Sequence, residues 1–307
     1  MEYYDEEAAR ERLVSWIQIR SSAEHAKHNV SKLLQDTQEA QAMECGIPHA
    51  WRLVTAVKEP EELVFKVQGV VVCSELPPFT KHLGRRKQLG FLRQGITLTG
   101  LGLSEFDDAV LGIKIGDLLL KRNVPAQGLE TLNCFGEFRG AQTIHLSNRY
   151  FTPRHLAKGE TPIQFGPEVD PAKVLQSASS PEFIHIRENV VEYEKALGEE
   201  KTDLRFERVS PALFRLGDIV EAQFTLMMVQ PRRALYKTIP VLRAITLLDD
   251  HFSKQLDVQA IRNADAERKQ GSSRQAYTLK RRAGNWDEVE GTAAKQLRKM
   301  KISERNP

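Results

Sequence analysis

The clearest alternation of apolar and polar residues lies in "SPALFRLGDIVEAQFTLMMVQ", residues 210–230. From residue 220 to residue 228 every even position is apolar, and Glu221, Gln223 and Thr225 stand between them. A period of two is typical of a strand with one buried face and one solvated face. Because Gly217 and Asp218 favour a turn just before this run, we predict a half-buried strand over 219–229.

A second apolar run, "LYKTIPVLRAITLLD" (235–249), follows after the short polar connection "QPRRA". Two such runs with a short connection predict a long β-hairpin. Pro240 has no amide hydrogen, so its strand is expected to be an edge there or to carry a bulge. Further strands are predicted at 182–188, 189–194 and 203–209, and the set favours a small antiparallel β barrel or sandwich.

The N-terminal half mixes two periodicities. Apolar residues at a loose three-to-four spacing over 5–43 predict two helices. Residues 62–73 predict a strand, because Val and Phe recur there without a helical pattern. Residues 105–123 predict a helix, although Gly112 and Gly116 each lower its propensity by ~1 kcal/mol relative to alanine.

The stretch 151–181 is dense in proline and glycine, which predicts a long loop or a linker between domains. We therefore predict an α+β protein with N-terminal helices, a mixed α/β middle region, a C-terminal β barrel or sandwich and a disordered basic tail. The expected divisions are a helical segment 1–46, a mixed region 47–150, a linker or loop 151–181, a small β module 182–252 and a mostly disordered tail 253–307.

Charge is unevenly distributed along the 307 residues, whose net charge is +3. Residues 251–307 contain 13 basic and 7 acidic residues, and few large apolar ones. A segment of this composition buries too little apolar surface to offset the entropy of ordering, so disorder is expected. Such a basic segment favours contact with nucleic acid or an acidic partner, while a solvated tail is the simpler alternative.

The compartment is predicted from what the chain lacks. No apolar run is long enough for a membrane span, and the acidic start lacks the apolar core of a secretion signal. Cys45, Cys73 and Cys134 are odd in number and widely spaced, which argues against a disulfide framework. The expected location is the nucleus or the cytoplasm, without secretion or membrane contact.

A family resemblance covers roughly residues 181–285. The pattern "YEKA…SPALFRLGDIVEAQ…YKTIPVLRAITLLD", with "LKRRAG" behind it, resembles an uncharacterised group of proteins from mushroom-forming fungi to which no activity is assigned. The resemblance implies a β-rich module ahead of a basic tail and implies no catalytic residue. "FRLGDIVEAQ" is also similar to the first strand of small β-barrels, including chromatin readers of the bromo-adjacent-homology type.

Sequence motifs for chemistry are weak. "TGLGLS" (99–104) has Glu105 where a dinucleotide fingerprint needs its third glycine, so a tight turn is the expected structure. His25 and His28 could share a metal on one helix face, but further ligands are missing. Cys134 and His145 could meet across a hairpin as nucleophile and base, although no motif supports that reaction. We therefore expect no cofactor, no metal and no assigned catalytic residue.

Clusters of basic residues offer a more specific prediction, because guanidinium groups match phosphate and carboxylate geometry. The candidates for contact with nucleic acid or an acidic partner are Arg85, Arg86, Lys87, Arg232 and Arg233. The candidates for an import signal or a tail contact are Lys280, Arg281 and Arg282.

The sequence as a whole predicts a non-enzymatic binding or adaptor protein. Two alternatives stay open at this stage. One is a hydrolase or transferase whose site is assembled from distant residues and is therefore invisible as a local motif. The other is a structural protein that forms a homo-oligomer through residues 5–43.

Overall fold

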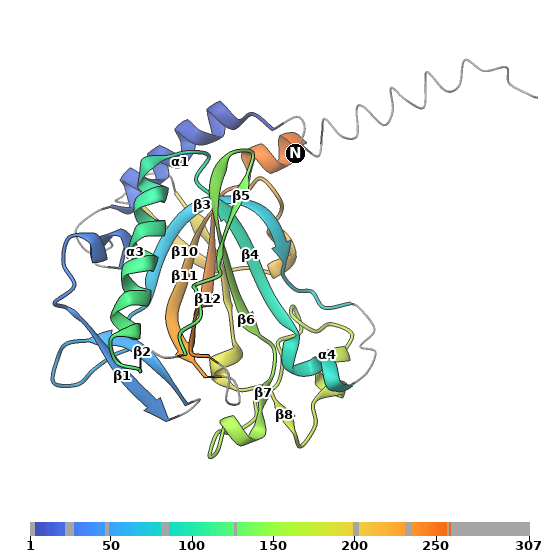
Figure 1. Cartoon of the computed structure of the whole chain (residues 1–307). Helices are drawn as coiled ribbons and strands as arrows, with labels where there is room; N and C mark the ends of the chain where they lie inside the picture. The colour runs from blue at the N-terminus through green and yellow to red at the C-terminus, as the bar shows by residue number, and fades with distance from the viewer. Residues whose placement is uncertain are drawn as a thin grey trace, which may run out of the picture. The chain divides into compact units, whose positions relative to one another are not determined.

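A computed structural model of the protein describes residues 4–21, 28–46, 49–80, 86–125, 128–198, 203–230, 235–256 and 258. A ten-stranded sheet dominates this part of the chain, in the order β1-β2-β11-β3-β4-β6-β12-β9-β10 with β5 beside β6 (Figure 1). Its strands are β1 (Ala40–Gly46), β2 (His49–Thr55), β3 (Phe65–Glu75), β4 (Arg93–Thr99), β5 (Phe135–Phe138), β6 (Ala141–Arg149), β9 (Glu192–Leu197), β10 (Arg205–Arg208), β11 (Ile219–Val229) and β12 (Lys237–Asp249).

The remaining elements are shorter or helical. The α-helices are α1 (Glu6–Arg20), α3 (Ser104–Lys121) and α4 (Val174–Ala178), and β7 (Thr152–Pro153) pairs with β8 (Phe183–Ile184). The 3-10 turns are η1 (Val30–Leu34), η2 (Arg86–Phe91), η3 (Arg154–Leu156), η4 (Arg187–Asn189) and η5 (Pro211–Leu213). The mixed α+β class is confirmed.

The N-terminal region departs from the two helices expected over 5–43. The helix α1 begins after Asp5, whose carboxylate accepts a hydrogen bond from the Ala8 amide at 3.1 Å, as an N-cap does. Its apolar residues are buried against the sheet, so this face of α1 is already occupied within the chain. Residues 40–46 form the strand β1, although residues up to 43 were expected to be helical. Pairing with β2 stabilises the extended conformation of this short segment.

The strand β11 joins regions that were expected to be separate. It pairs with β12 on one edge, and on the other edge with β3 and then with β2. The strand β12 in turn pairs in parallel with β6 and with β9. The sheet therefore does not follow the expected division into a mixed region 47–150 and a β module 182–252. Local alternation predicts strands, but their long-range partners are not encoded locally.

The predicted hairpin of β11 and β12 is confirmed, but its two register shifts lie away from Pro240, one between Ile219 and Val220 and one between Gln223 and Phe224. Gln223 lies opposite Ala244 and Phe224 lies opposite Leu242, so Arg243 is the extra residue. Pro240 lies opposite Leu226, three residues before the extra residue Arg243. Because a bulge changes which residues face the core, Arg243 is free to project toward the opposite face.

The even positions of β11 lie in the main core as predicted, but the expectation of a solvated second face is wrong. Glu221 is 1 % exposed. Arg20 at the end of α1 donates hydrogen bonds to its carboxylate from Nε at 2.8 Å and from Nη2 at 2.7 Å, and Gln68 donates another at 2.7 Å. The helix α1 therefore covers this face and supplies the charge that Glu221 needs.

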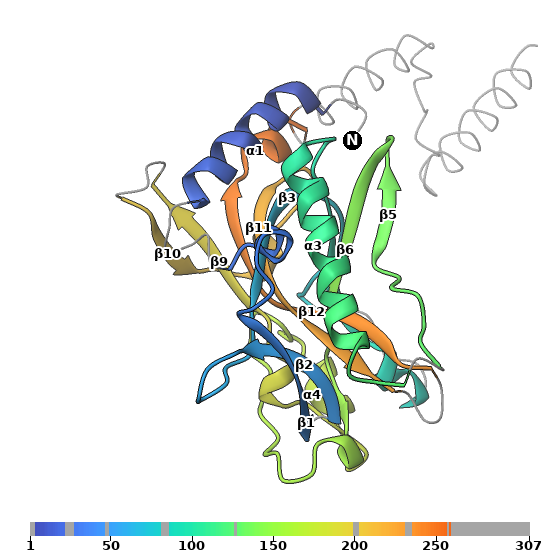
Figure 2. The same cartoon turned by 60° about the vertical axis from the view of Figure 1, so that its left-hand side comes forward.

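The helix α3 runs beside β3 and β11 (Figures 1 and 2). The predicted helix over 105–123 is confirmed, and its two glycines have a packing role. A Cβ on Gly112 would lie 2.2 Å from the Val30 carbonyl oxygen, and a Cβ on Gly116 would lie 2.3 Å from Leu226 Cδ1. The glycines thus let η1 and β11 approach the helix closely.

The stretch 151–181 is a loop that packs on the sheet and does not link two modules. Leu89, Tyr150, Phe151 and Leu175 form a small buried cluster there. Asp170 fixes the start of α4, because its carboxylate accepts hydrogen bonds from the amides of Val174 and Gln176 at 2.7 and 2.8 Å. Proline and glycine limit the length of the elements, while the aromatic residues provide the core.

The expected tail 253–307 is described at 253–256 and 258. Residues 251–256 are helical, and the Phe252 ring meets the Tyr4 ring edge-on at a centroid distance of 6.0 Å. The first residues of the expected tail therefore belong to the folded part of the chain. The rest of the tail lies outside the described residues.

Candidate anion-binding surface

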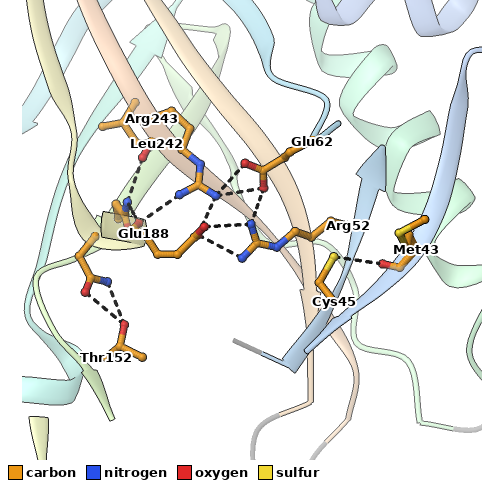
Figure 3. Close-up of polar contacts among 10 residues, drawn as sticks. Met43, Cys45, Arg52, Glu62, Thr152, Glu188, Leu242 and Arg243 are labelled. Carbon is orange, nitrogen blue, oxygen red and sulfur yellow. Dashed lines mark hydrogen bonds and ion pairs between the residues drawn. The ribbon is translucent and has the colours of Figure 1, made fainter. Parts of the chain in front are cut away.

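Two arginines and two glutamates from four separate segments meet on one face of the sheet (Figure 3). Arg52 Nη1 donates to Glu62 Oε1 at 2.7 Å, and Arg52 Nη2 donates to Glu188 Oε2 at 3.1 Å. Arg243, at the bulge of β12, donates from Nη2 to Glu62 Oε1 at 3.0 Å and to Glu188 Oε2 at 2.9 Å. The four side chains form a closed network in which each arginine contacts both carboxylates.

Hydrogen bonds to its own backbone carbonyl hold Glu188 in place. Arg243 Nη1 and Asn148 Nδ2 donate to the Glu188 carbonyl at 3.1 and 2.9 Å, and Asn148 also donates to the Leu242 carbonyl. Burial raises the pKa of Glu188, but Arg243 and Arg52 outweigh this effect and hold the pKa below its usual range. Glu188 is therefore a carboxylate at neutral pH, and the charges within the network balance.

Two more arginines stand beside this network. Arg93 begins β4 and Arg149 ends β6, and the two residues lie directly opposite each other in the antiparallel pair. Arg149 is half-buried and Arg93 is exposed. Within the described residues, neither guanidinium makes a hydrogen bond or an ion pair. Like charges at opposed positions destabilise a strand pair, and only the charge of Glu188 near Arg149 acts against this cost.

The electrostatics of Arg149 reflect that cost. Burial and the positive charges of Arg93 and Arg52 lower the pKa of Arg149 to about 10, against the opposing effect of Glu188. Arg149 is still a cation at neutral pH. We define the arginine surface as Arg52, Arg93, Arg149 and Arg243 with Glu62 and Glu188, a set with two positive charges in excess. A bound anion at Arg93 and Arg149 would neutralise that excess.

The basic residues singled out from the sequence are not among the side chains that the structure describes. Arg85, Arg232, Arg233, Lys280, Arg281 and Arg282 lie outside the described residues. Arg86 and Lys87 begin η2, whose backbone leads into β4, but their side chains are not described. The basic cluster 85–87 therefore precedes Arg93 by only a short length of chain.

The sequence pair Cys134 and His145 is brought together in the backbone alone. The His145 amide donates to the Cys134 carbonyl at 2.7 Å, while the His145 ring bonds the Thr97 hydroxyl at 3.2 Å. The Cys134 side chain lies in the main core, where burial, followed by the charge of Asp117, raises the pKa of its thiol to about 12. A thiol in this environment is a poor nucleophile.

The other weak motifs also have structural explanations. Gly102 has a φ of +77°, and a Cβ on Gly100 would lie 2.2 Å from the Phe106 Cβ, so "TGLGLS" is a tight turn packed under α3. His28 is exposed and lies beyond the end of α1, and His25 is outside the described residues. Across the described ranges, no three His, Cys, Asp or Glu side chains are grouped as metal ligands. No helix in these ranges is both long and apolar enough to cross a membrane.

Comparison with known proteins leaves the function open. No protein-family model matches the chain, and none of the curated proteins matches it significantly. The resemblance to a group of fungal proteins therefore stays a prediction.

Sequence reasoning missed the arginine surface, although one signal was present. Arg243 is a charged residue inside an otherwise apolar strand, "VLRAITLL", which indicates a buried partner or a binding role. Arg93 and Arg149 gave no such signal, because each stands at the end of its strand. Their juxtaposition depends on the register of β4 with β6, which the sequence does not reveal.

Proposed function

We propose that the protein is a non-enzymatic binding protein whose arginine surface contacts the phosphates of a nucleic acid, in the nucleus or the cytoplasm. The observation that carries the proposal is the opposed pair of Arg93 and Arg149, which has no partner among the described residues. Directly opposed cross-strand side chains lie close together, so one phosphate can accept hydrogen bonds from both guanidinium groups.

The network behind this pair supports a fixed binding geometry. Arg52 and Arg243 are paired with Glu62 and Glu188, so they are held in place and do not compete for the ligand. Preorganised side chains lose less entropy when a ligand binds. The basic clusters elsewhere in the sequence favour a polyanion over a small acid, because each additional contact releases counterions from a nucleic acid.

The proposal can be tested by fluorescence anisotropy with labelled single- and double-stranded DNA and RNA, at low and at physiological salt. We expect the full chain to bind and its affinity to fall steeply with salt. In the double variant Arg93→Gln/Arg149→Gln, the slope of log affinity against log salt should become shallower by about 1, since the one phosphate that the two arginines share is no longer neutralised. Arg205→Gln is the matched control, because Arg205 is an exposed arginine of β10 that is not part of the arginine surface.

Four further results would decide the matter. Arg149→Gln should unfold at the same temperature as the wild type or above it, because the replacement removes a charge repulsion. A chain ending at Val258 should retain surface binding, and this end keeps the packed Phe252. Equal salt slopes for the double variant and the wild type would place binding elsewhere. Binding of poly-glutamate but of no nucleic acid would indicate an acidic protein partner instead.

A further inference from the structure

A cavity of about 200 Å³ lies between the sheet and residues 164–169 of the packed loop. Its aromatic lining comes from Tyr150, Phe165, His185 and Tyr193. The Phe165 and His185 rings are stacked, with centroids 3.9 Å apart and planes inclined by 24°. For comparison, an apolar cavity of roughly 150 Å³ binds benzene, so this one has room for a small planar molecule.

Polar and charged side chains also line the cavity, namely Gln94, Gln164, Glu168, Asn189, Glu192 and Arg208. The Tyr193 hydroxyl is engaged, since it donates to Gln94 Oε1 at 2.7 Å. His185 Nδ1 lies 2.8 Å from the Tyr150 carbonyl oxygen. A carbonyl can only accept, so Nδ1 carries the proton and the neutral ring presents a lone pair at Nε2. Burial lowers the pKa of His185, which keeps the ring neutral at physiological pH.

Besides His185 Nε2, the Tyr150 hydroxyl is a second polar group of the cavity without a hydrogen-bond partner. Tyr150 is 2 % exposed and His185 is 6 % exposed, yet within the described residues neither the hydroxyl nor Nε2 has a hydrogen-bond partner. Burial raises the pKa of Tyr150, so its hydroxyl remains a donor. One donor and one acceptor therefore line the same cavity without a protein partner. Neither is among the fully buried polar atoms that lack a partner, so both are accessible to water, which a ligand could displace.

We propose that this cavity is a binding site for a neutral planar heterocycle with a cyclic-amide edge. The ring packs against the aromatic walls, its N–H donates to His185 Nε2, and its carbonyl accepts from the Tyr150 hydroxyl. A neutral ligand matches the His185 ring and the Tyr150 hydroxyl, because both of these groups are uncharged. The proposal is independent of the arginine surface and of the function proposed for it.

The test uses isocarbostyril, a bicyclic cyclic amide, and its N-methyl derivative, titrated calorimetrically into the full chain. We expect saturable binding of isocarbostyril and about tenfold weaker binding of the N-methyl compound, since the hydrogen bond to His185 Nε2 is lost. Tyr150→Phe should weaken binding of isocarbostyril by a similar factor. The same variant should unfold at the wild-type temperature, because its hydroxyl has no partner to lose.

Tyr236→Phe is the matched control, because it removes a tyrosine hydroxyl outside the cavity, and its affinity should equal that of the wild type. Two results would overturn the proposal. The first is equal affinity for both compounds together with an unaffected Tyr150→Phe variant, which would mean that the cavity selects only for apolar rings. The second is the absence of saturable binding up to millimolar concentrations.

Discussion

At the scale of single residues, Glu221 decides how α1 is attached to the sheet. Burial raises the pKa of this carboxyl, but hydrogen bonds and charge from Arg20, with help from Lys66, outweigh burial and hold the pKa below its usual range. Glu221→Ala leaves the Arg20 guanidinium, whose side chain is 3 % exposed, without its carboxylate. We expect the free energy of unfolding in urea to fall by roughly 3–5 kcal/mol, the usual cost of breaking a buried ion pair.

A matched variant separates the pair from its packing. In Arg20→Met/Glu221→Leu both charges are replaced by apolar groups of similar volume, which is often nearly neutral. The double variant should therefore be more stable than Glu221→Ala. If Glu221→Ala loses less than about 1 kcal/mol, then Glu221 is not essential to the attachment of α1.

At the scale of elements, the glycines of α3 show why propensity alone misjudges a helix. Gly112→Ala raises the helix propensity by about 1 kcal/mol. The added methyl group meets the Val30 carbonyl, which belongs to the backbone of η1 and cannot rotate away. We expect a net loss of roughly 1–3 kcal/mol in the free energy of unfolding, as for other overpacked positions.

Leu111→Ala is the control for this substitution. Leu111 precedes Gly112 on α3 and is 46 % exposed, so its stability change should stay within about 0.5 kcal/mol. A Gly112→Ala variant more stable than the wild type would show that η1 moves aside at little cost.

The same contrast between local and distant information explains how much of this fold the sequence could predict. The period of two in β11 located the strand and its core side correctly, because side-chain alternation is a local property. It did not reveal that Arg20, 201 positions away, covers Glu221 on the other side. Likewise, Arg93 and Arg149 form a candidate site only through the register of β4 with β6.

At the scale of the molecule, the described strands lie in one compact unit. Residues 182–252, expected to be an independent β module, contain β9 to β12. However, β11 pairs with β3 and β12 pairs with β6, and both of these partners lie outside that range. Phe224 packs on Phe65, with ring centroids 6.0 Å apart. A peptide of residues 182–252 loses these partners and exposes the even positions of β11, and it should therefore lack the dispersed amide NMR spectrum of a folded domain. The full chain, measured under the same conditions, is the reference. A cooperatively folded peptide would mean that the hairpin carries its own core and that its pairing with β3 adds little to stability.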